Sequence, residues 1–556
     1  MDLGASAVHA GGVPPGQIES RFEGFDFVIV GAGSAGSVLA ARLTQDARVR
    51  VLLLEAGTAR EPMSARVPAA FSKLFKSRHD WSFETEPEAQ LNQRRLFVPR
   101  GKLLGGSSAM NAMIYIRGNP ADYDGWAGLG ATGWGYANVL PFFVRSEDQA
   151  RGALPGHGQG GPLRVEDLRS PNPLSHAFVE ACAELGMARN DDFNSGSQEG
   201  AGLYQVTQKG GVRWSAANAY LFPAMRRANL TVRRGAHTLR VILEGDRATG
   251  IEYLERGVTH KVRATSSVVL CAGAIGSPQL LMLSGIGPEP DLRGVGILPQ
   301  VASAGVGQNL QDHPIAGILR HSVQPITLRN AEGPWALLEY ALFRRGLLSS
   351  NIAEAGAFIQ SPMAGGLPDI QFHFSPGLFL NHGLDRPRIH GFSIGPTLVA
   401  PRSRGRLSLR SNRPFDKPLI FGNHLSHPDD RKALLWGLEL GRELAQARAF
   451  DAFRGDEYWP DEVPQPPCGL EAHLRRTAEL LYHPSGTCRM GKGELSVVDP
   501  ELRVRGVRGL HVADASVMPV ITRGNTHAPT VMIAERLASF LSQSPSSDDA
   551  WRCRAS

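Results

Sequence analysis

The segment FDFVIVGAGSAGSVLAARL, residues 25–43, decides the fold. Its first part, Phe25–Val30, is a short and largely apolar run, which is typical of a buried parallel strand. A glycine-rich turn, residues 31–36, follows directly, and a helix is expected over residues 34–45. A second apolar run, VRVLLLEAG at residues 49–57, completes a strand–helix–strand unit of about 30 residues.

The turn has the spacing of a dinucleotide site, with Gly31, Gly33 and Gly36 forming GxGxxG. The first glycine allows the tight turn, the second lets a pyrophosphate approach the backbone, and the third permits close packing of helix and strand. The positive end of the helix dipole points toward the phosphates. Glu55, which ends the second strand, can accept hydrogen bonds from a ribose. These features predict a dinucleotide site but do not separate FAD from NAD. The other residues expected in this site are Ser34, Ala35 and Ala56.

The composition indicates a globular protein with more than one lobe. The chain has 556 residues, of which 42% are hydrophobic and 20% charged, and this length exceeds a single hydrophobic core. A net charge of +6 without a long basic run gives no support for a nucleic-acid partner. The cysteines are odd in number and never spaced as CxxC, so we expect reduced thiols in the cytoplasm and no metal site. They are Cys182, Cys271, Cys468, Cys488 and Cys553.

The sequence predicts no membrane span. Neither a secretory signal pattern at the start nor a run of 18 apolar residues is present. The segment WALLEYALFRRGLL, residues 335–348, is amphipathic. Packing on the core is favoured for it, and peripheral contact with a membrane surface is the alternative. The tails, residues 1–24 and 542–556, are expected to be flexible.

The remainder of the chain alternates between two patterns. Short apolar runs at residues 230–232, 250–253 and 267–271 match the style of the first strands, and GLHVADASVMP, residues 509–519, returns to it. Residues 315–493 instead mix alternating strands with helices. This shift indicates a separate lobe inserted between parts of the nucleotide-binding lobe.

Several long motifs resemble one family. PRGKLLGGSSAMNAMIYIRG, residues 99–118, resembles the first signature of the glucose–methanol–choline (GMC) oxidoreductases, and GAIGSPQLLMLSGIGP, residues 273–288, resembles the second. HPSGTCRMG (483–491), VADASVMP (512–519) and GNTHAPTVMIAERLA (524–538) are similar to its C-terminal pattern, as found in the choline dehydrogenase-like bacterial branch. The resemblance implies FAD as cofactor and an FAD-dependent alcohol dehydrogenase or oxidase.

The resemblance also implies the fold class and the domains. We expect an α/β fold in which a Rossmann-like FAD-binding lobe carries an inserted α+β substrate-binding lobe. The FAD-binding lobe is expected to comprise residues 25–170, 215–314 and 494–541. The substrate-binding lobe is expected to comprise residues 171–214 and 315–493.

The first signature implies further cofactor contacts. Its small residues would let the backbone run close to the flavin, and the residues after them match positions that line the isoalloxazine ring. Met110 stands where some choline-oxidising relatives carry a histidine linked to the flavin, and a thioether cannot form that bond. We therefore expect non-covalent FAD. For Asp514 a helix cap is the alternative role. The expected contacts are Gly105, Gly106, Asn111, Ala112, Met113, Thr238, Asp514, Ala515 and Ala528.

His483 and His527 match the catalytic pair of the family. Hydride leaves a carbinol carbon as the hydroxyl proton departs, and a neutral imidazole is suited to take that proton. A second hydrogen-bonding group steadies the charge on the oxygen. We expect His483 to be the base and His527 the oxygen-binding partner, although which ring is the dominant base stays open. A helix is expected to start near Pro529.

The substrate class is less defined by the sequence. Glu354 matches a position where choline-oxidising relatives place a carboxylate, and Tyr482 is expected in the pocket. A neutral primary alcohol, oxidised to an aldehyde, is preferred. Choline oxidation proper, a lyase and a fatty-acid photodecarboxylase are the alternatives. The electron acceptor is O2, a quinone or another molecule.

Overall fold

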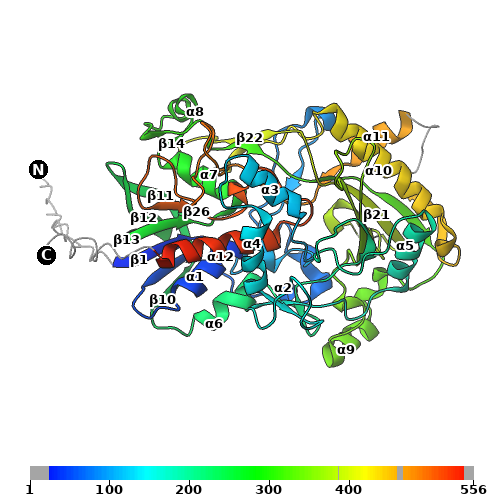
Figure 1. Cartoon of the computed structure of the whole chain (residues 1–556). Coiled ribbons are helices and arrows are strands. Elements are labelled where there is room, and N and C mark those ends of the chain that lie inside the picture. The colour runs from blue at the N-terminus through cyan, green and yellow to red at the C-terminus, as the bar shows by residue number, and fades with distance from the viewer. Residues whose placement is uncertain (1–23, 386, 460–467, 544–556) are drawn as a thin grey trace, which may run out of the picture.

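Two β-sheets stand side by side in the computed structural model, which describes residues 24–385, 387–459 and 468–543 (Figure 1). The sequence predictions for the two tails, and for Cys553, lie outside these residues apart from the positions at the borders. Among the described residues no helix combines the length and the apolar character needed to cross a membrane.

The first sheet has seven strands in the order β10-β2-β1-β13-β12-β11, with β26 also paired to β13. The pairs from β10 to β13, and β13 with β26, are parallel, whereas β12 and β11 add an antiparallel edge. β1 and β2 are almost fully buried, with α1 (Ser34–Leu43) packed against both strands and β11 in contact with β2, which confirms the two strands expected from the sequence. The strands are β1 Gly24–Val30, β2 Val51–Glu55, β10 Leu230–Arg234, β11 Ala236–Glu244, β12 Arg247–Glu255, β13 Val258–Leu270 and β26 Leu510–Val512.

The helix of the opening motif, α1 (Ser34–Leu43), packs against the last helix of the chain, α12 (His527–Gln543). Arg42 donates from Nε and Nη2 to the buried Glu535 carboxylate at 2.7–3.0 Å. The Tyr220 hydroxyl donates to the same carboxylate at 2.8 Å, so the charge is paired and hydrogen-bonded. α12 begins two residues before the predicted start and fixes the two ends of the described chain together.

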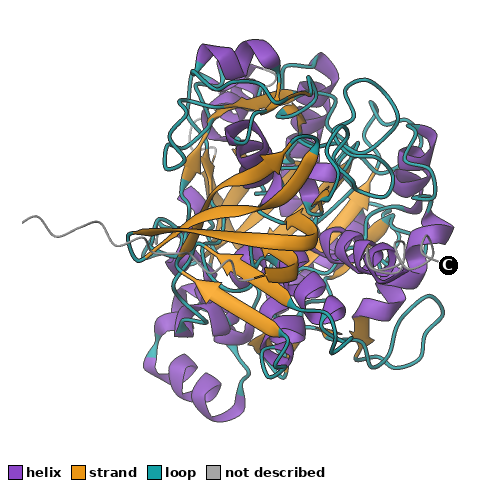
Figure 2. Ribbon diagram, turned by 90° about the vertical axis from the view of Figure 1, so that its left-hand side faces the viewer, coloured by secondary structure: helices purple, strands orange, loops and turns teal. Residues whose placement is uncertain are grey.

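The second sheet has eight strands, in the order β24-β18-β21-β20-β19-β7 with β17 and β25 at one side, and every pair is antiparallel. α5 (Pro173–Glu184) and α10 (Pro428–Gln446) pack on it. Figure 2 shows the first sheet in front, with helices around it. The strands are β7 Gly200–Leu203, β17 Pro314–Ile315, β18 Ile318–Ser322, β19 Ala355–Ile359, β20 Ile370–Ser375, β21 Gly391–Leu398, β24 Arg454–Trp459 and β25 Glu479–Leu480.

The mixed α/β fold expected from the sequence is confirmed by these two sheets and their helices. The exact boundaries of the two lobes stay a prediction. The remaining helices that bear on the site are short segments at its rim. They are α2 Met63–Arg66, the 3-10 helix η1 Pro68–Leu74, α7 Gly273–Leu283, the 3-10 helix η9 Ala515–Val517 and α11 Cys468–Thr477.

One expectation from the sequence is wrong. The segment 335–348 was expected to pack on the core, and it forms α9 (Pro334–Phe343) at the surface, at the lower edge of the molecule in Figure 1. Within α9 only Tyr340 is buried, whereas Trp335 is 80% exposed and Leu342 64% exposed. The helix is apolar on nearly every side, so its periodicity did not show which side the protein would cover.

Candidate active site

A cavity of about 980 Å³ runs from the glycine-rich turn to the two predicted catalytic histidines. Its volume lies at the upper end of the ~300–1,000 Å³ typical of ligand pockets. Most of the predicted site residues line it, whereas Gly36, Gly105, Ala528 and Glu354 do not. The lining residues among those predicted are Gly31, Gly33, Ser34, Ala35, Glu55, Ala56, Gly106, Asn111, Ala112, Met113, Thr238, Tyr482, His483, Asp514, Ala515 and His527.

The glycines of the turn are required by close backbone contacts. Gly31 has φ +98°, and a Cβ there would lie 2.5 Å from the Cys271 carbonyl oxygen. A Cβ on Gly36 would lie 1.9 Å from the Gly31 carbonyl oxygen, so this glycine serves packing and does not reach the cavity. A Cβ on Gly106 would lie 2.7 Å from the Gly33 Cα, so the first signature touches the turn.

Glu55 closes the same end of the cavity. Its carboxylate accepts hydrogen bonds from the Ala32 amide at 3.0 Å and the Gly57 amide at 2.8 Å. Burial raises the pKa of Glu55 to about 7, although the hydrogen bonds from these two amides act to lower it. The buried Thr238 hydroxyl, also in the lining, has no hydrogen-bond partner within the described protein. A glycine cradle at a helix N-terminus, a strand-end carboxylate and a free hydroxyl fit a bound dinucleotide.

Asp514 has the cap role that the sequence left as its alternative, and it also lines the cavity. Its Oδ1 accepts from the Ser516 amide at 2.8 Å, at the start of η9. Its Oδ2 accepts from the Gly273 amide at 2.9 Å and from the Ser277 hydroxyl at 2.6 Å. The carboxylate therefore ties the end of β26 to the start of α7.

A chain of hydrogen bonds defines the tautomer of His483. Gln371 Nε2 donates to Asn525 Oδ1 at 3.3 Å, which turns the Asn525 Nδ2 toward His483 Nε2 at 3.4 Å. His483 Nε2 is then the acceptor, so its proton is on Nδ1, which lies 3.0 Å from His313 Nδ1. The network therefore places an unprotonated Nε2 of His483 at the cavity, where its lone pair accepts the long hydrogen bond from Asn525 that an alcohol hydroxyl would replace.

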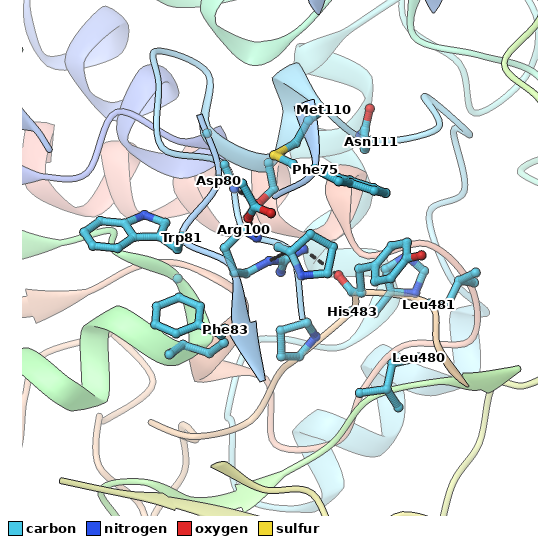
Figure 3. A pocket seen from close by; sticks show the side chains of 18 of the residues that line it. Phe75, Asp80, Trp81, Phe83, Arg100, Met110, Asn111, Leu480, Leu481 and His483 are labelled. Carbon is cyan, nitrogen blue, oxygen red and sulfur yellow. Dashed lines mark hydrogen bonds between the residues drawn. The ribbon is translucent and has the colours of Figure 1, made fainter. Parts of the chain in front are cut away.

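The backbone around His483 is held as firmly as its ring. Asp312 Oδ1 accepts from the His483 amide at 2.7 Å and from the His313 amide at 2.8 Å. Arg100 donates from Nη2 to the Tyr482 carbonyl at 2.6 Å, and Figure 3 shows Arg100 between Asp80 and the segment of His483. Tyr482 has φ +65°, a strained conformation that these contacts maintain.

The two histidines are both neutral near pH 7 but differ in their contacts. Burial, and then the neighbouring His313 imidazole, hold the pKa of His483 well below its ordinary value of 6.5. Burial, followed by Arg213, lowers the pKa of His527 to about 4. His527 Nδ1 lies 3.0 Å from the Ser34 hydroxyl, and its buried Nε2 has no partner among the described residues.

The wall near His483 is aromatic and apolar. Phe71, Phe75 and Met110 belong to one buried cluster, and all three line the cavity. The Tyr482 ring packs edge-on against Phe75, with centroids 5.6 Å apart, while its hydroxyl lies 2.6 Å from His382 Nδ1. This part of the cavity suits the carbon chain or ring of an apolar ligand.

Comparison with known proteins identifies the family. Two family models described as GMC oxidoreductase match residues 25–315 and residues 401–534. The chain belongs to the GMC oxidoreductases. Its cofactor is FAD, and it is an oxidoreductase that acts on CH–OH donors, in agreement with the resemblance found in the sequence. The cavity residues described above fit this cofactor.

Three similar proteins extend over almost the whole chain. An alcohol dehydrogenase (acceptor) of Pseudomonas putida is 42% identical over 93% of this chain and 95% of its own. An oxygen-dependent choline dehydrogenase of Rhizobium meliloti (strain 1021) is also 42% identical over 93% of this chain and 95% of its own. The crystal structure of pyridoxine 4-oxidase from Mesorbium loti superposes with a TM-score of 0.86 at 33% identity, covering 94% and 100% of the two chains.

Glu354 is not where the substrate prediction placed it. Its side chain is 1% exposed, and its carboxylate accepts from the Ser350 hydroxyl at 2.6 Å, the Asn172 amide at 2.7 Å and the Ser175 hydroxyl at 2.7 Å. Three donors leave this buried group no face for a ligand, and it does not line the cavity. In this geometry the carboxylate of Glu354 bonds to its own surroundings, and its contact with substrate stays a prediction.

The sequence reasoning missed four residues that hold His483 in place. Asn525 stands inside the quoted GNTHAP motif, two residues before His527, and attention to the motif's other polar member would have found it. Asp312, His313 and Arg100 give no comparable signal, because each acts on a segment more than 100 residues away.

Proposed function

We propose that this GMC oxidoreductase oxidises an apolar primary alcohol to an aldehyde, with His483 as the base. The observation that carries the proposal is the hydrogen-bonded chain from Gln371 through Asn525, which makes His483 Nε2 an acceptor at the cavity. A buried imidazole that is neutral at pH 7 can take a hydroxyl proton without first losing one of its own.

The second histidine takes the complementary role. With the Ser34 hydroxyl donating to His527 Nδ1, the proton of that ring is on Nε2, where no protein partner competes for it within the described structure. His527 then donates to the alcohol oxygen while His483 Nε2 accepts the hydroxyl proton, which favours the charge that develops on the oxygen. FAD, when bound, supplies the acceptor for the hydride that leaves the carbinol carbon.

Non-covalent attachment of FAD is part of the proposal. Met110 is 3% exposed and packs with Phe71 and Phe75 beside the cavity. A thioether at this position offers no nitrogen for a bond to the flavin. Precipitation of the protein with acid should therefore release all of the FAD into the supernatant.

The apolar wall supports a neutral substrate over choline. Recognition of a quaternary ammonium combines a carboxylate with open aromatic faces, and the wall of Phe71, Phe75 and Tyr482 supplies only the aromatic part. Glu354 is occupied by three donors, and Glu479, which does line the cavity, is ion-paired with Arg94. Choline, a lyase reaction and photodecarboxylation remain the alternatives, and O2 or a quinone remains the acceptor to be assigned.

The test is the anaerobic visible spectrum of the purified protein with octanol, benzyl alcohol or choline added in the dark. An apolar alcohol should bleach the flavin bands. His483→Ala should keep FAD but slow that bleaching by ~10²–10⁴-fold, as loss of a general base implies.

The matched control is His260→Ala, a histidine that stacks on Tyr253 in the first sheet away from the cavity. It should bleach like the wild type. Equal bleaching rates in His483→Ala and wild type would reject the assignment of His483 as the base. Bleaching by choline alone would favour choline as the substrate. No bleaching by any alcohol would favour the lyase and photodecarboxylase alternatives. Admission of air after bleaching tests O2 as the acceptor.

A further inference from the structure

An apolar helix face is open to solvent on α9. Trp335, Leu338 and Leu342 are spaced i, i+3 and i+7, so they share one side of the helix. Contiguous apolar side chains at a protein surface mark an interaction site rather than an ordinary solvated face. We call this surface the α9 face; its residues and exposed fractions are Trp335 80%, Leu338 48%, Leu342 64% and Phe343 53%, whereas Leu337, 52% exposed, lies on the other side of the helix.

Positive charges border the α9 face. Arg344 and Arg345 follow the last turn of the helix, and Arg344 lies over the Tyr340 ring, with its guanidinium 5.1 Å from the centroid. Exposed Arg329 precedes the helix, and half-exposed Arg66 stands on α2 close enough to influence Tyr340.

The acidic side chains at the same border are already paired. Glu332 forms an ion pair with Lys73, and Glu339 with Arg345. Arg66 is likewise ion-paired with Glu61, so five basic side chains (Arg66, Lys73, Arg329, Arg344 and Arg345) face three acidic ones (Glu61, Glu332 and Glu339). The excess of two positive charges is complementary to anionic groups.

We infer that the α9 face docks on an anionic lipid surface, with the helix lying in the plane of the interface. Trp, Leu and Phe on one side of a helix with arginines beside them is the pattern of interfacial helices. With ten residues, α9 is about 15 Å long, which is too short to span a bilayer. The helix projects from the body of the molecule (Figure 1), so it can enter the headgroup layer without a complementary groove in a partner.

The inferred docking surface lies next to the wall of the cavity. Tyr340 of α9 belongs to a small buried cluster against which Val67 and Ala69 pack, at the start of η1. Phe71, in the same 3-10 helix, lines the cavity. A single 3-10 helix thus separates the bilayer from the cavity, and the inference about α9 stands whether or not the proposed substrate is correct.

The experiment is flotation of the full chain with vesicles of phosphatidylcholine alone or mixed with phosphatidylglycerol. We expect binding to the mixed vesicles that weakens with added salt, because the arginine contribution is screened. The variant Trp335→Ser/Leu338→Ser/Leu342→Ser should lower the vesicle partition coefficient by about tenfold or more. The matched control, Leu129→Ser/Val258→Ser/Leu298→Ser, removes three equally exposed apolar side chains elsewhere and should bind like the wild type.

Two measurements distinguish contact of the α9 face with lipid from contact with a second copy of the protein. Brominated lipids should quench the tryptophan fluorescence of the wild type more than that of Trp335→Phe. Size-exclusion chromatography should give the same elution volume for the wild type and the triple α9 variant. Failure to float with anionic vesicles overturns the inference, and so does a wild-type dimer that the triple variant converts to a monomer, since the occupant would then be a second copy.

Discussion

The two ends of the cavity are built in opposite ways. At the dinucleotide end, Gly31, Gly33 and Gly106 bring backbone against backbone, and what matters is the absence of side chains. At the catalytic end, Asn525 and His313 fix the ring of His483 through side-chain hydrogen bonds. The first end accommodates a ligand because side chains are absent from it. The second end uses side-chain hydrogen bonds to fix which nitrogen of His483 carries the proton. Substitutions should therefore separate cofactor binding from catalysis.

The largest expected effect tests the backbone end. Gly33 has φ −76°, and a Cβ there would find only the Gly106 Cα at 3.9 Å, so Gly33→Ala should fold normally. The added methyl group would occupy the approach of the pyrophosphate and weaken FAD binding by about a hundredfold. Titration of the apoprotein with FAD measures this. The control is Gly125→Ala, where a Cβ meets nothing within 4 Å. Unaltered FAD affinity in Gly33→Ala would show that the missing side chain at this end does not matter for cofactor binding.

A smaller effect is expected at the catalytic end. His313→Leu removes the acceptor for the His483 Nδ1 proton and should slow flavin reduction by roughly ten- to a hundredfold, with FAD affinity unchanged. His313→Asn keeps a side-chain acceptor and should restore part of the rate. Stopped-flow reduction across pH is the measurement. A uniform loss in both variants, with no change in the pH profile, would show that His313 only supports packing.

Glu354, which the sequence analysis placed at the substrate, gives a third test. Glu354→Gln replaces an acceptor of three hydrogen bonds and should lower the free energy of unfolding by ~1–3 kcal/mol. KM for the alcohol should not change, because the carboxylate does not reach the cavity. Urea unfolding and steady-state kinetics measure the two quantities, with exposed Glu443→Gln as the control. A large rise in KM with an unchanged free energy of unfolding would indicate that Glu354 contacts the substrate, as the sequence analysis predicts.

The smallest effect is a displacement of the pH profile. Burial holds the pKa of His483 below 6.5, so the ring stays neutral as the pH falls through that value. The acid limb of kcat/KM should therefore have its midpoint below 6.5. An acid limb with its midpoint near 7 would instead point to Asp312, because burial raises the pKa of Asp312 to about 7. In that case Asp312→Asn would remove the acid limb.

The sequence predicted the dinucleotide end because all of its information is local. Two strands, one turn and one helix between Gly24 and Glu55 specify it, and GxGxxG in that setting indicates a dinucleotide site. The histidine pair was predicted only through resemblance to a family. The tautomer of His483 was not predicted, because it depends on Gln371 and Asn525, which are 154 residues apart in the chain.

Glu354 and α9 show the limits of pattern reading in this protein. Glu354 directly precedes β19, and nothing in the local sequence tells whether its carboxylate points to a ligand or to Ser350 and Ser175. In α9 apolar residues occupy nearly all sides, so no amphipathic stripe distinguishes a buried helix from an exposed one. In both cases the outcome is decided by tertiary neighbours.

The ion pair between Arg42 and Glu535 bears on how the chain folds as it is synthesised. The two residues are 493 positions apart, so α1 is synthesised long before the helix on which it packs. Ribosomes add ~5–20 residues per second, so the apolar face of α1 lacks its packing partner α12 for roughly 25–100 s during synthesis. During that interval the nascent chain carries a Rossmann lobe that lacks α12. Truncation within α12 should therefore unravel the opposite end of the polypeptide first.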